Sequence, residues 1–448
     1  MLENPQATSE PSDAYQQRIA HNYLWNFCAS TVDGGVFSFV MSLLSPVVVL
    51  PYYAGFLSRS ALVPGAVYTF YALGRTMPQV VAANMTKHLA RKKPFMVWMA
   101  LLERAGIALI FVTTLLLPAE DTRGILVVFL MGYALLTLSL GFMSPAWLDF
   151  LAKAIYKRRG TFFGVLNATG GFLSILGSLA FTAMARRYPF PQSFTIAFGL
   201  ALAVSSVSLA ALAAYREVPS PFTAARTSLR KHLESLPDLL ERDRNFRLFA
   251  LSRAAIGAAD IAVPFYAIYA LQRTQGSTVE VATLNLTLMV CQAVSTLLWG
   301  YLGDRRGYRL IYRLATATGF ATAGLALVVS GLAGYVLVFL LLGITLGGLT
   351  IADSNLVLEL SPRDQTPTYV GLMNLILGPV MGLAPLVGGL LASAWGYPAL
   401  FVIAMFAQAI GWAGMTTLVR DPREIPRTSA PLTQVVPPPP GSSSRAPE

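Results

Sequence analysis

Long apolar runs alternate with short polar connections along almost the whole chain. Each run has roughly the 20 residues that an α-helix needs to cross a bilayer. Backbone groups find no water inside a bilayer, so such runs form helices and not open strands. The pattern predicts an all-α integral membrane protein with twelve transmembrane helices, at 24–45, 61–83, 94–117, 124–146, 161–185, 194–214, 247–271, 281–302, 310–331, 334–357, 368–393 and 397–419.

The 33 basic residues are divided unequally between the two sides of this predicted topology. The termini and every second connection hold 25 of them, and three lie inside spans: Arg75, Arg104 and Arg253. The opposite side holds five: Arg59, Arg123, Arg186, Arg187 and Arg273. Basic loops stay in the cytoplasm during insertion. We therefore expect both termini inside the cell and a location in the cell membrane, the inner membrane if the source is Gram-negative.

Composition narrows the function further. The chain is 55% hydrophobic and only 12% charged, and its isoelectric point is near 9.7. Topology explains this positive charge, so we expect membrane lipids and no nucleic acid as partners. The sequence has no Walker A loop, no G-x-S-x-G setting for a serine and only three scattered histidines. We expect no cofactor, no metal and no enzyme.

Polar stretches divide the chain into five parts. Spans one to six form one bundle at 24–215 and spans seven to twelve another at 247–420. A cytoplasmic segment, 1–23, precedes them, and a linker, 216–246, joins them. Leucines spaced three and four apart in the linker predict an amphipathic helix. The last part, 421–448, is rich in Pro and Ser, and we expect it to be disordered.

A short internal echo indicates duplication. Phe163–Asn167 opens the fifth predicted span with FGVLN, and Val370–Asn374 opens the eleventh with VGLMN. The two segments occupy matching places in a six-plus-six plan. Internal symmetry of this kind is typical of secondary transporters. The two bundles are therefore expected to be related by pseudo-symmetry.

The loop after the eighth span carries the sharpest motif. Gly300–Arg309 reads GYLGDRRGYR and resembles the G-x-L-A-D-R-x-G-x-R loop of the major facilitator superfamily, especially its bacterial permeases. The resemblance covers 24–420. It implies small-molecule transport by alternating access, with spans one, four, seven and ten lining a central cavity. It also implies an inner gate formed by Gly300, Asp304, Arg305, Gly307 and Arg309.

Two other segments qualify this resemblance. The equivalent first-half loop, Asn84–Lys93, keeps the positive charge but lacks the acid and the glycines. Its gate is therefore in doubt. Gly378-Pro379-x-x-Gly382 lies on span eleven, where we expect a kink and close helix packing.

Charges inside the first bundle gather at one depth. A charge at the bilayer centre costs roughly 2.5–3.5 kcal/mol on insertion scales, so such residues mark pairs or pathways. Asp33, Arg75, Glu103 and Arg104 lie at similar depth. One interpretation is two structural ion pairs, Arg75 with Glu103 and Asp33 with Arg104. In the other, Asp33 faces the central cavity and binds a proton or a cationic substrate.

The second bundle has its own candidates. Asp260 lies near the middle of span seven, close to Pro264 and Tyr266. A carboxylate beside a weakened helix and aromatic rings suits an organic cation or a proton. Asp353 lies near the inner end of span ten. Uncharged polar residues in spans add possible hydrogen bonds to substrate or between helices: Asn167, Gln292 and Asn374.

These observations predict a secondary active transporter that binds a small molecule and is coupled to protons through Asp33 or Asp260. We expect it to export amphipathic or cationic compounds and to act as a monomer. Two alternatives stay open. One is an uptake permease for a polar metabolite, and the other is a membrane scaffold or lipid-handling protein that transports nothing.

Overall fold

The computed structural model describes residues 13–116, 121–220, 236–362, 366–421 and 423. The described residues form helices and no strand. The first half contains α1 (Asp13–Leu43), α2 (Val49–Leu57), α3 (Leu62–Thr86), α4 (Lys93–Leu116), α5 (Thr122–Ala154), α6 (Arg159–Arg187) and α7 (Gln192–Ala213). The second contains α9 (Leu236–Arg242), α10 (Arg244–Ala258), α11 (Tyr266–Thr274), α12 (Thr278–Arg306), α13 (Tyr308–Val328), α14 (Gly331–Leu360), α15 (Thr366–Trp395) and α16 (Tyr397–Thr417).

Each predicted span corresponds to a long helix or, for the seventh, to a helix in two parts. Ten of these segments are long and apolar enough to cross a membrane. The first and second spans, α1 and α3, are as long as the others but are not among the ten. The all-α membrane architecture is confirmed, and the full number of twelve crossings stays a prediction.

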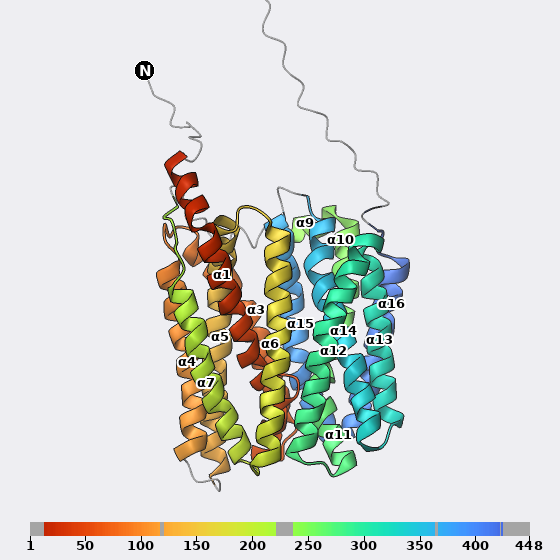
Figure 1. Ribbon diagram of the computed structural model, residues 1–448. Coiled ribbons are helices and arrows are strands. Elements are labelled where there is room, and N and C mark those ends of the chain that lie inside the picture. The colour runs from red at the N-terminus through yellow and green to blue at the C-terminus, as the bar shows by residue number, and fades with distance from the viewer. Residues whose placement is uncertain (1–12, 117–120, 221–235, 363–365, 422, 424–448) are drawn as a thin grey trace, which may run out of the picture.

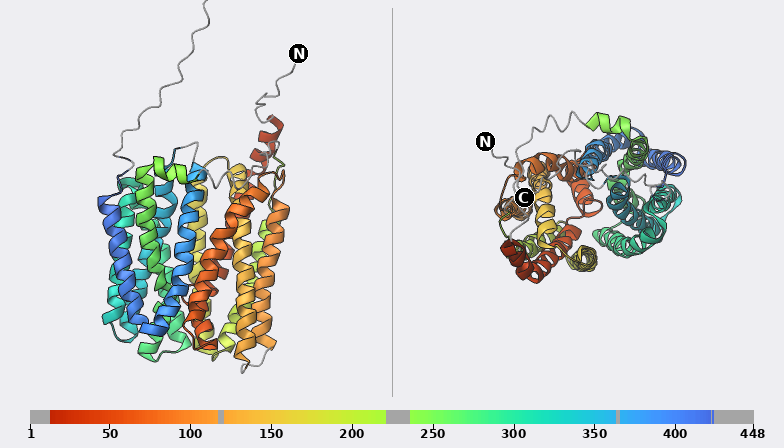
Figure 2. Two further views of the ribbon diagram at one scale, coloured as in Figure 1. Left: turned by 180° about the vertical axis from the view of Figure 1, so that it is seen from behind. Right: turned by 90° about the horizontal axis from the view of Figure 1, so that it is seen from above.

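The helices form two bundles that stand side by side (Figures 1 and 2). The first half, red to yellow-green, lies on the left of Figure 1, and the second, green to blue, on the right. We call the end where α1 begins and α16 ends the terminal end, and the opposite one the far end. Most of the predicted linker helix falls within 221–235 and lies outside the described residues, and only the short α9 is described there.

The seventh span is interrupted at its centre. α10 ends at Ala258, and two turns of 3-10 helix follow, at Ala259–Ile261 and Val263–Phe265. α11 then begins at Tyr266. Pro264 has no N–H to continue an α-helical ladder, which explains the break. The weakening predicted beside Asp260 is therefore present.

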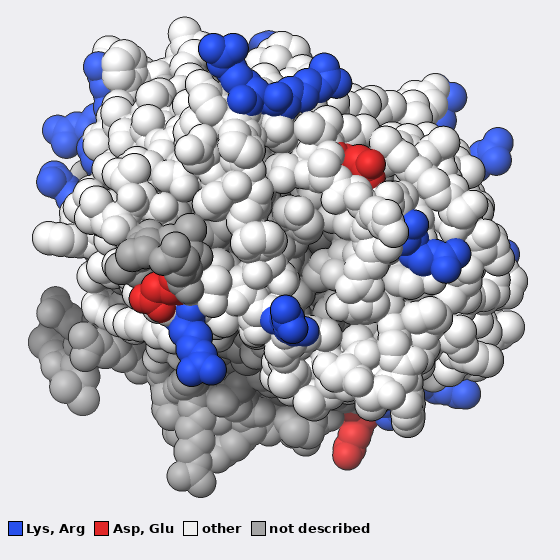
Figure 3. Space-filling view, turned by 90° about the horizontal axis from the view of Figure 1, so that it is seen from below, with Lys and Arg blue, Asp and Glu red and all other residues white. Residues whose placement is uncertain are grey.

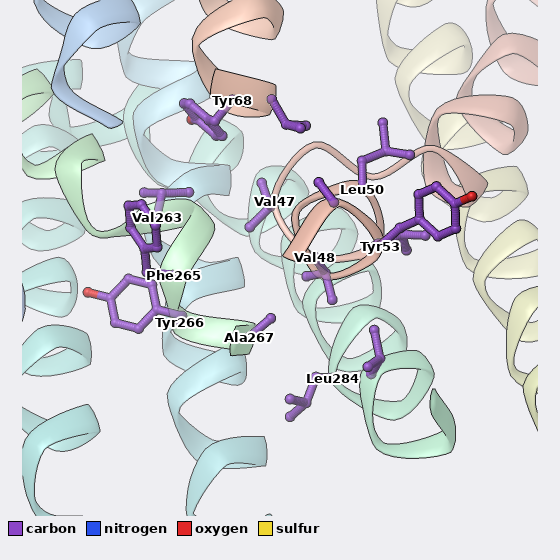
Figure 4. Packing of buried hydrophobic residues seen from close by; sticks show 14 of the residues in the cluster. Val47, Val48, Leu50, Tyr53, Tyr68, Val263, Phe265, Tyr266, Ala267 and Leu284 are labelled. Atoms are coloured by element: carbon purple, nitrogen blue, oxygen red, sulfur yellow. The ribbon is translucent and has the colours of Figure 1, made fainter. Parts of the chain in front are cut away.

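The two halves meet at the far end in one apolar core. This far-end cluster joins residues 40–57 of the first half to residues 259–288 of the second. Figure 4 shows part of it, with Val47 and Val48 beside Ala267 and Leu284. Removing this much apolar surface from water holds the far end closed.

At the terminal end the apolar cores are separate. One cluster contains only first-half residues, such as Met96, Phe150 and Tyr215. The other contains only second-half residues, such as Phe249 and Met415. The bundles therefore share a core at the far end and not at the terminal end. The described residues thus close the far end with a shared apolar core, whereas each half has its own core at the terminal end.

The charge distribution follows the same axis. The five basic residues predicted on the second side lie at helix ends and connections of the far end. Figure 3 views that end and shows a mostly uncharged face with scattered basic side chains.

Glycines allow α15 to pack closely on α3. A Cβ at Gly382 would overlap Leu73, and one at Gly378 would overlap Met77. On the α3 side, a Cβ at Gly65 would overlap the carbonyl of Pro385. The glycines of the Gly-Pro-x-x-Gly segment therefore serve helix packing, as predicted, and they join the two halves.

Candidate functional site

Asp33 lies inside the first bundle, on the side of α1 that packs against α7. Its carboxylate accepts hydrogen bonds from Ser208 Oγ at 2.6 Å and from Tyr215 OH at 2.7 Å. Trp147 Nε1 in turn donates to Tyr215 OH at 3.3 Å. With 8% of its surface exposed, Asp33 is enclosed by its own half. The interpretation in which it faces the space between the halves is wrong.

Arg104 and Glu103 form a buried ion pair beside this carboxylate. Arg104 Nη1 lies 3.1 Å from Glu103 Oε1. The other nitrogens of Arg104 donate to the carbonyl of Ser205 and to Ser208 Oγ, both at 2.9 Å from Nη2. Ser208 thus links Arg104 to Asp33. The predicted pair of Asp33 with Arg104 is indirect, and its geometry is that of a structural brace between α1, α4 and α7.

Arg75 does not pair with Glu103. Its Nη1 donates to Tyr71 OH at 2.7 Å, and the guanidinium carbon lies 5.4 Å from the centre of the Tyr71 ring. None of the described Asp or Glu side chains forms a salt bridge with it. The predicted pair is absent: Glu103 pairs with the neighbouring Arg104 through one carboxylate oxygen, and Arg75 bonds a tyrosine on its own helix. Arg75 is exposed although it lies midway along α3.

Asp260 lies in the first 3-10 turn of the broken seventh span, 7% exposed. Tyr68 OH on α3 lies 3.5 Å from Asp260 Oδ2. No described Lys, Arg or His forms a salt bridge with it. The Tyr68–Asp260 contact joins the first half to the second. A rearrangement that separates the halves at the far end must break it.

Arg253 and Asp353 form an ion pair within the second bundle. Arg253 Nε and Nη2 donate to the two carboxylate oxygens at 2.6 and 2.8 Å, and Tyr312 OH donates to the same carboxylate. Arg253 is 2% exposed, whereas the Asp353 side chain is 34% exposed. Arg253 is therefore paired with α14 and forms no salt bridge with Asp260. Asp353 keeps one side open to solvent.

The other predicted residues have different surroundings. Tyr266 is buried and stacks on Phe401 at 4.8 Å, so it packs in the far-end core and does not line a binding site. Asn374 Nδ2 lies 3.4 Å from Gln79 Oε1 across the two halves. Asn167 is exposed on α6, and Gln292 is half-buried on α12.

The predicted gate loop holds together the second half alone. Gly307 has a φ of +88° and forms the turn between α12 and α13. Asp304 accepts a hydrogen bond from Tyr308 OH at 2.5 Å and forms no salt bridge with a described arginine. Arg309 donates to the carbonyls of Met415 and Thr416 at 3.0 and 2.7 Å. Arg309 thereby braces α13 against α16. Its positive charge lies at the C-terminal end of α16, where the helix dipole is negative and stabilises a cation.

The gate-loop residues differ in how tightly they pack. Gly300 has open space around it, whereas a Cβ at Gly303 would overlap the Tyr308 ring. The guanidinium of Arg305 lies over the Tyr301 ring, 4.3 Å from its centre. The gate role that the resemblance implies for Gly300 and Arg305 stays a prediction.

An acidic residue from outside the first-half loop binds to that loop. Glu217, just after α7, accepts hydrogen bonds from the backbone N–H groups of Lys92 and Lys93 at 2.7 and 2.8 Å. The ammonium of Lys92 pairs with Asp149. Burial lowers the pKa of Lys92, against the opposing effect of Asp149. A carboxylate at the N-terminus of α4 thus replaces the missing acid of the loop.

Polar contacts also cross between the halves near the far end. Asn285 on α12 is fully buried, and its Nδ2 donates to the carbonyl of Ser42 at 3.2 Å and to Ser178 Oγ at 2.9 Å. Thr182 Oγ1 lies 3.5 Å from the carbonyl of Ala282. Together with Tyr68–Asp260, these contacts close the far end with directional bonds.

Known proteins share this architecture. Residues 248–440 match the sequence model of the Major Facilitator Superfamily. A variant of the nucleoside transporter NupG matches with a TM-score of 0.67 at 11% identity, over 88% of this chain and 99% of that one. The chain has the fold of the Major Facilitator Superfamily. The predicted resemblance is confirmed.

Two further structures agree. The human organic anion transporter MFSD10 matches with a TM-score of 0.61 at 13% identity, over 88% of this chain and 99% of that one. The E. coli fucose:proton symporter FucP gives 0.58 and 15%, over 88% and 98%. No curated protein matches the sequence. These Major Facilitator Superfamily neighbours are transporters and not enzymes, in agreement with the sequence.

The family match falls on the half whose gate loop conforms to the motif. Sequence reasoning missed three tyrosines that interact electrostatically with Arg75, namely Tyr68 and Tyr71 on α3 and Tyr133 on α5. A single signal was present: Tyr68 and Tyr71 lie seven and four residues before Arg75 and therefore share its helix face. Among the described residues, no group of three His, Cys, Asp or Glu is placed to hold a metal ion.

Proposed function

We propose that this multi-pass membrane protein is a secondary active transporter that moves a small molecule by alternating access and exchanges protons through Asp260. The observation that most directly supports this proposal is the contact between Tyr68 OH and Asp260 Oδ2, because it joins the two halves beside a helix break. Export of a small amphipathic compound is the proposed direction, as the sequence predicts.

The packing supports a rocking motion of the two halves. They share one core at the far end and have separate cores at the terminal end. The opposite state requires the far-end contacts to separate and the terminal ends to approach. With the topology predicted from the basic loops, the present state is open to the cytoplasm.

Asp260 is suited to carry the proton because its surroundings change with that motion. In the present state it is buried, with one long hydrogen bond and no salt bridge to a described residue. A carboxylate taken out of water favours its neutral form. Separation from Tyr68 exposes the same carboxylate to water at the far end, where it releases or takes up a proton.

Asp33 supplies a matched control for this assignment. It is equally buried but accepts two short hydrogen bonds within its own half. Rocking of the halves leaves these bonds in place. Asp33→Asn is therefore expected to preserve proton coupling, whereas Asp260→Asn is expected to abolish it.

The experiment uses the full chain in liposomes loaded with a pH-sensitive dye. A panel of small aromatic acids, amines and neutral analogues is added, and proton movement is recorded. We expect a compound-dependent pH change in the parent and in Asp33→Asn, and none in Asp260→Asn. Equal proton movement in all three proteins would contradict the role of Asp260. Compound movement that needs no far-end opening would contradict alternating access.

A further inference from the structure

Arg75 lies on the side of α3 that also reaches the second half. It shares a helix face with Tyr68, seven residues earlier, whose hydroxyl lies 3.5 Å from Asp260 of the second half. Val81, an exposed apolar side chain of α3, lies on a different face, whereas Met77 packs against Gly378 of α15. Arg75 is itself exposed, so neighbouring side chains do not cover it.

Arg75 also differs from the other arginines inside spans. Arg104 has a carboxylate partner and several carbonyl and hydroxyl acceptors, and Arg253 has a two-pronged carboxylate partner. Arg75 has Tyr71 OH as its only side-chain acceptor among the described residues. A guanidinium carries five N–H donors in a planar fork that matches a carboxylate or a phosphate. Most of this capacity is unused.

A second polar group next to Arg75 lacks a partner. Tyr133 on α5 is fully buried, and its hydroxyl makes no hydrogen bond with any described residue. It interacts electrostatically with both Arg75 and Tyr71. Leaving a buried hydroxyl unpaired costs free energy, which an incoming acceptor recovers. Among the described residues, the Arg75 guanidinium thus has no carboxylate partner, and the Tyr133 hydroxyl near it has no acceptor.

We propose that the transported molecule carries an anionic group, a carboxylate or an equivalent oxyanion, which binds Arg75 with Tyr133 OH as a second donor. This inference rests on the proposed function and specifies its substrate class. Tyr71 is a positioning residue, because its hydroxyl fixes the guanidinium. The rings of Tyr68 and Tyr71, 5.9 Å apart, offer an apolar surface to the rest of the molecule. The substrate is an amphipathic organic anion and not the organic cation that the sequence suggests.

Binding to the purified full-length protein in detergent tests the proposal without any need for transport. The probes are an aromatic carboxylate, the matching phosphonate, the neutral amide and the amine of the same skeleton. A ligand that binds the folded state raises the melting temperature by mass action. We expect the two anions to raise it and the amide and amine to leave it unchanged. Preference between carboxylate and phosphonate identifies the oxyanion.

Variants assign the effect to this site. Arg75→Gln is expected to weaken carboxylate binding roughly tenfold or more, and Tyr133→Phe by a smaller factor. Arg75→Lys keeps the charge and retains part of the binding, which guards against a folding defect in Arg75→Gln. Arg187→Gln is the control, because Arg187 also lies beside a tyrosine ring, at 6.0 Å, but at the far-end surface.

Three results would overturn the inference: stabilisation by the amine in place of the anions, equal stabilisation by the amide, or undiminished anion binding in Arg75→Gln. These outcomes are distinct from a failure of proton coupling. If Asp260→Asn moves protons normally while anions bind through Arg75, the substrate class stands and the coupling role of Asp260 is wrong. If Asp260→Asn abolishes proton movement but anions do not bind through Arg75, the coupling role of Asp260 stands and the substrate class is wrong.

Discussion

Asn26 and Asn245 make the same contact in the two halves of the molecule. Asn26 exchanges two hydrogen bonds with the backbone of Arg216, at 3.0 and 2.9 Å, and Asn245 does so with Arg420, at 3.1 and 2.8 Å. Each asparagine is near the start of its half, and each arginine follows that half's last helix. The duplicated contact supports the pseudo-symmetry that the FGVLN and VGLMN segments predict.

These two asparagines give the first prediction. Asn26→Ala leaves a backbone N–H and C=O of Arg216 without partners in a buried setting, since Asn26 is only 3% exposed. We expect a loss of about 1–3 kcal/mol, measured as a lower melting temperature in detergent. Asn245 is half-buried, so Asn245→Ala is expected to cost less. Asn355→Ala is the control, because Asn355 bonds only within its own helix. Equal losses of stability in all three variants would contradict a bracing role for Asn26 and Asn245.

The second prediction concerns Arg253 and Asp353. Asp353→Asn removes the charge partner of an arginine that is 2% exposed. Breaking a buried pair in this way costs about 3–5 kcal/mol, and the double change Arg253→Met with Asp353→Leu is expected to cost less than Asp353→Asn alone. Thermal unfolding of the three variants tests this order.

A surface pair provides the reference for that experiment. Arg423 Nη2 lies 2.8 Å from Glu359 Oε1, and the two side chains are 40% and 23% exposed. Glu359→Gln is expected to cost at most about 1 kcal/mol. A comparable loss in Glu359→Gln and Asp353→Asn would show that burial of the Arg253 pair has no special effect.

The third prediction uses the far-end contact of Ser178 with Asn285. Cysteines at both positions, in a chain with Cys28 and Cys291 replaced by serine, are expected to react with a short cross-linker and hold the far end closed. Transport of an aromatic carboxylate should stop and return after the link is cleaved. Thr318 and Thr345, with hydroxyls 2.9 Å apart, offer a control pair within the second half. Transport that continues in the cross-linked Ser178/Asn285 protein would rule out opening of the far end.

The fourth prediction tests the packing of α3 on α15. Gly65→Leu forces a side chain against the backbone of Pro385, which cannot rotate away. Overpacking of this kind costs about 1–3 kcal/mol. We expect a lower melting temperature and faster hydrogen exchange in both helices. Gly164→Leu, on α6, meets nothing within 4 Å and is expected to be neutral. Equal effects of the two substitutions would contradict close packing at Gly65.

The sequence predicted the helices well because bilayer thickness and charge asymmetry are imposed along the chain. It also located the break beside Asp260, since proline acts locally. It did not predict the partners of buried charges. Depth alone matched Arg75 to Glu103, but depth does not give the direction of a side chain around its helix. Arg104 reaches Glu103 because the two residues are adjacent, whereas Arg75 bonds Tyr71 on its own helix.

The same limit explains Asp33. From the sequence, a carboxylate on the first span, which the resemblance places at the cavity, suggested access to that cavity. The structure places it against Ser208 of α7 and Tyr215, just after that helix, more than 170 residues away. Contacts at that sequence separation depend on how helices pack, and a hydropathy pattern carries no such information. Polar residues within the spans, Ser208 and Tyr68 among them, were the available signal.

Arg75 lies midway along α3 and forms no salt bridge with a described residue, so the proposed rocking has an electrical consequence. Under the proposed alternating access, water would reach Arg75 from one face of the membrane and then from the other, so its charge would cross part of the electric field with little movement of the side chain. A full elementary charge corresponds to about 2.3 kcal/mol per 100 mV. Under the proposed anion binding, the bound anion would cancel that charge. The voltage would then act on the return of the empty protein more than on the loaded step, which would give the cycle a direction.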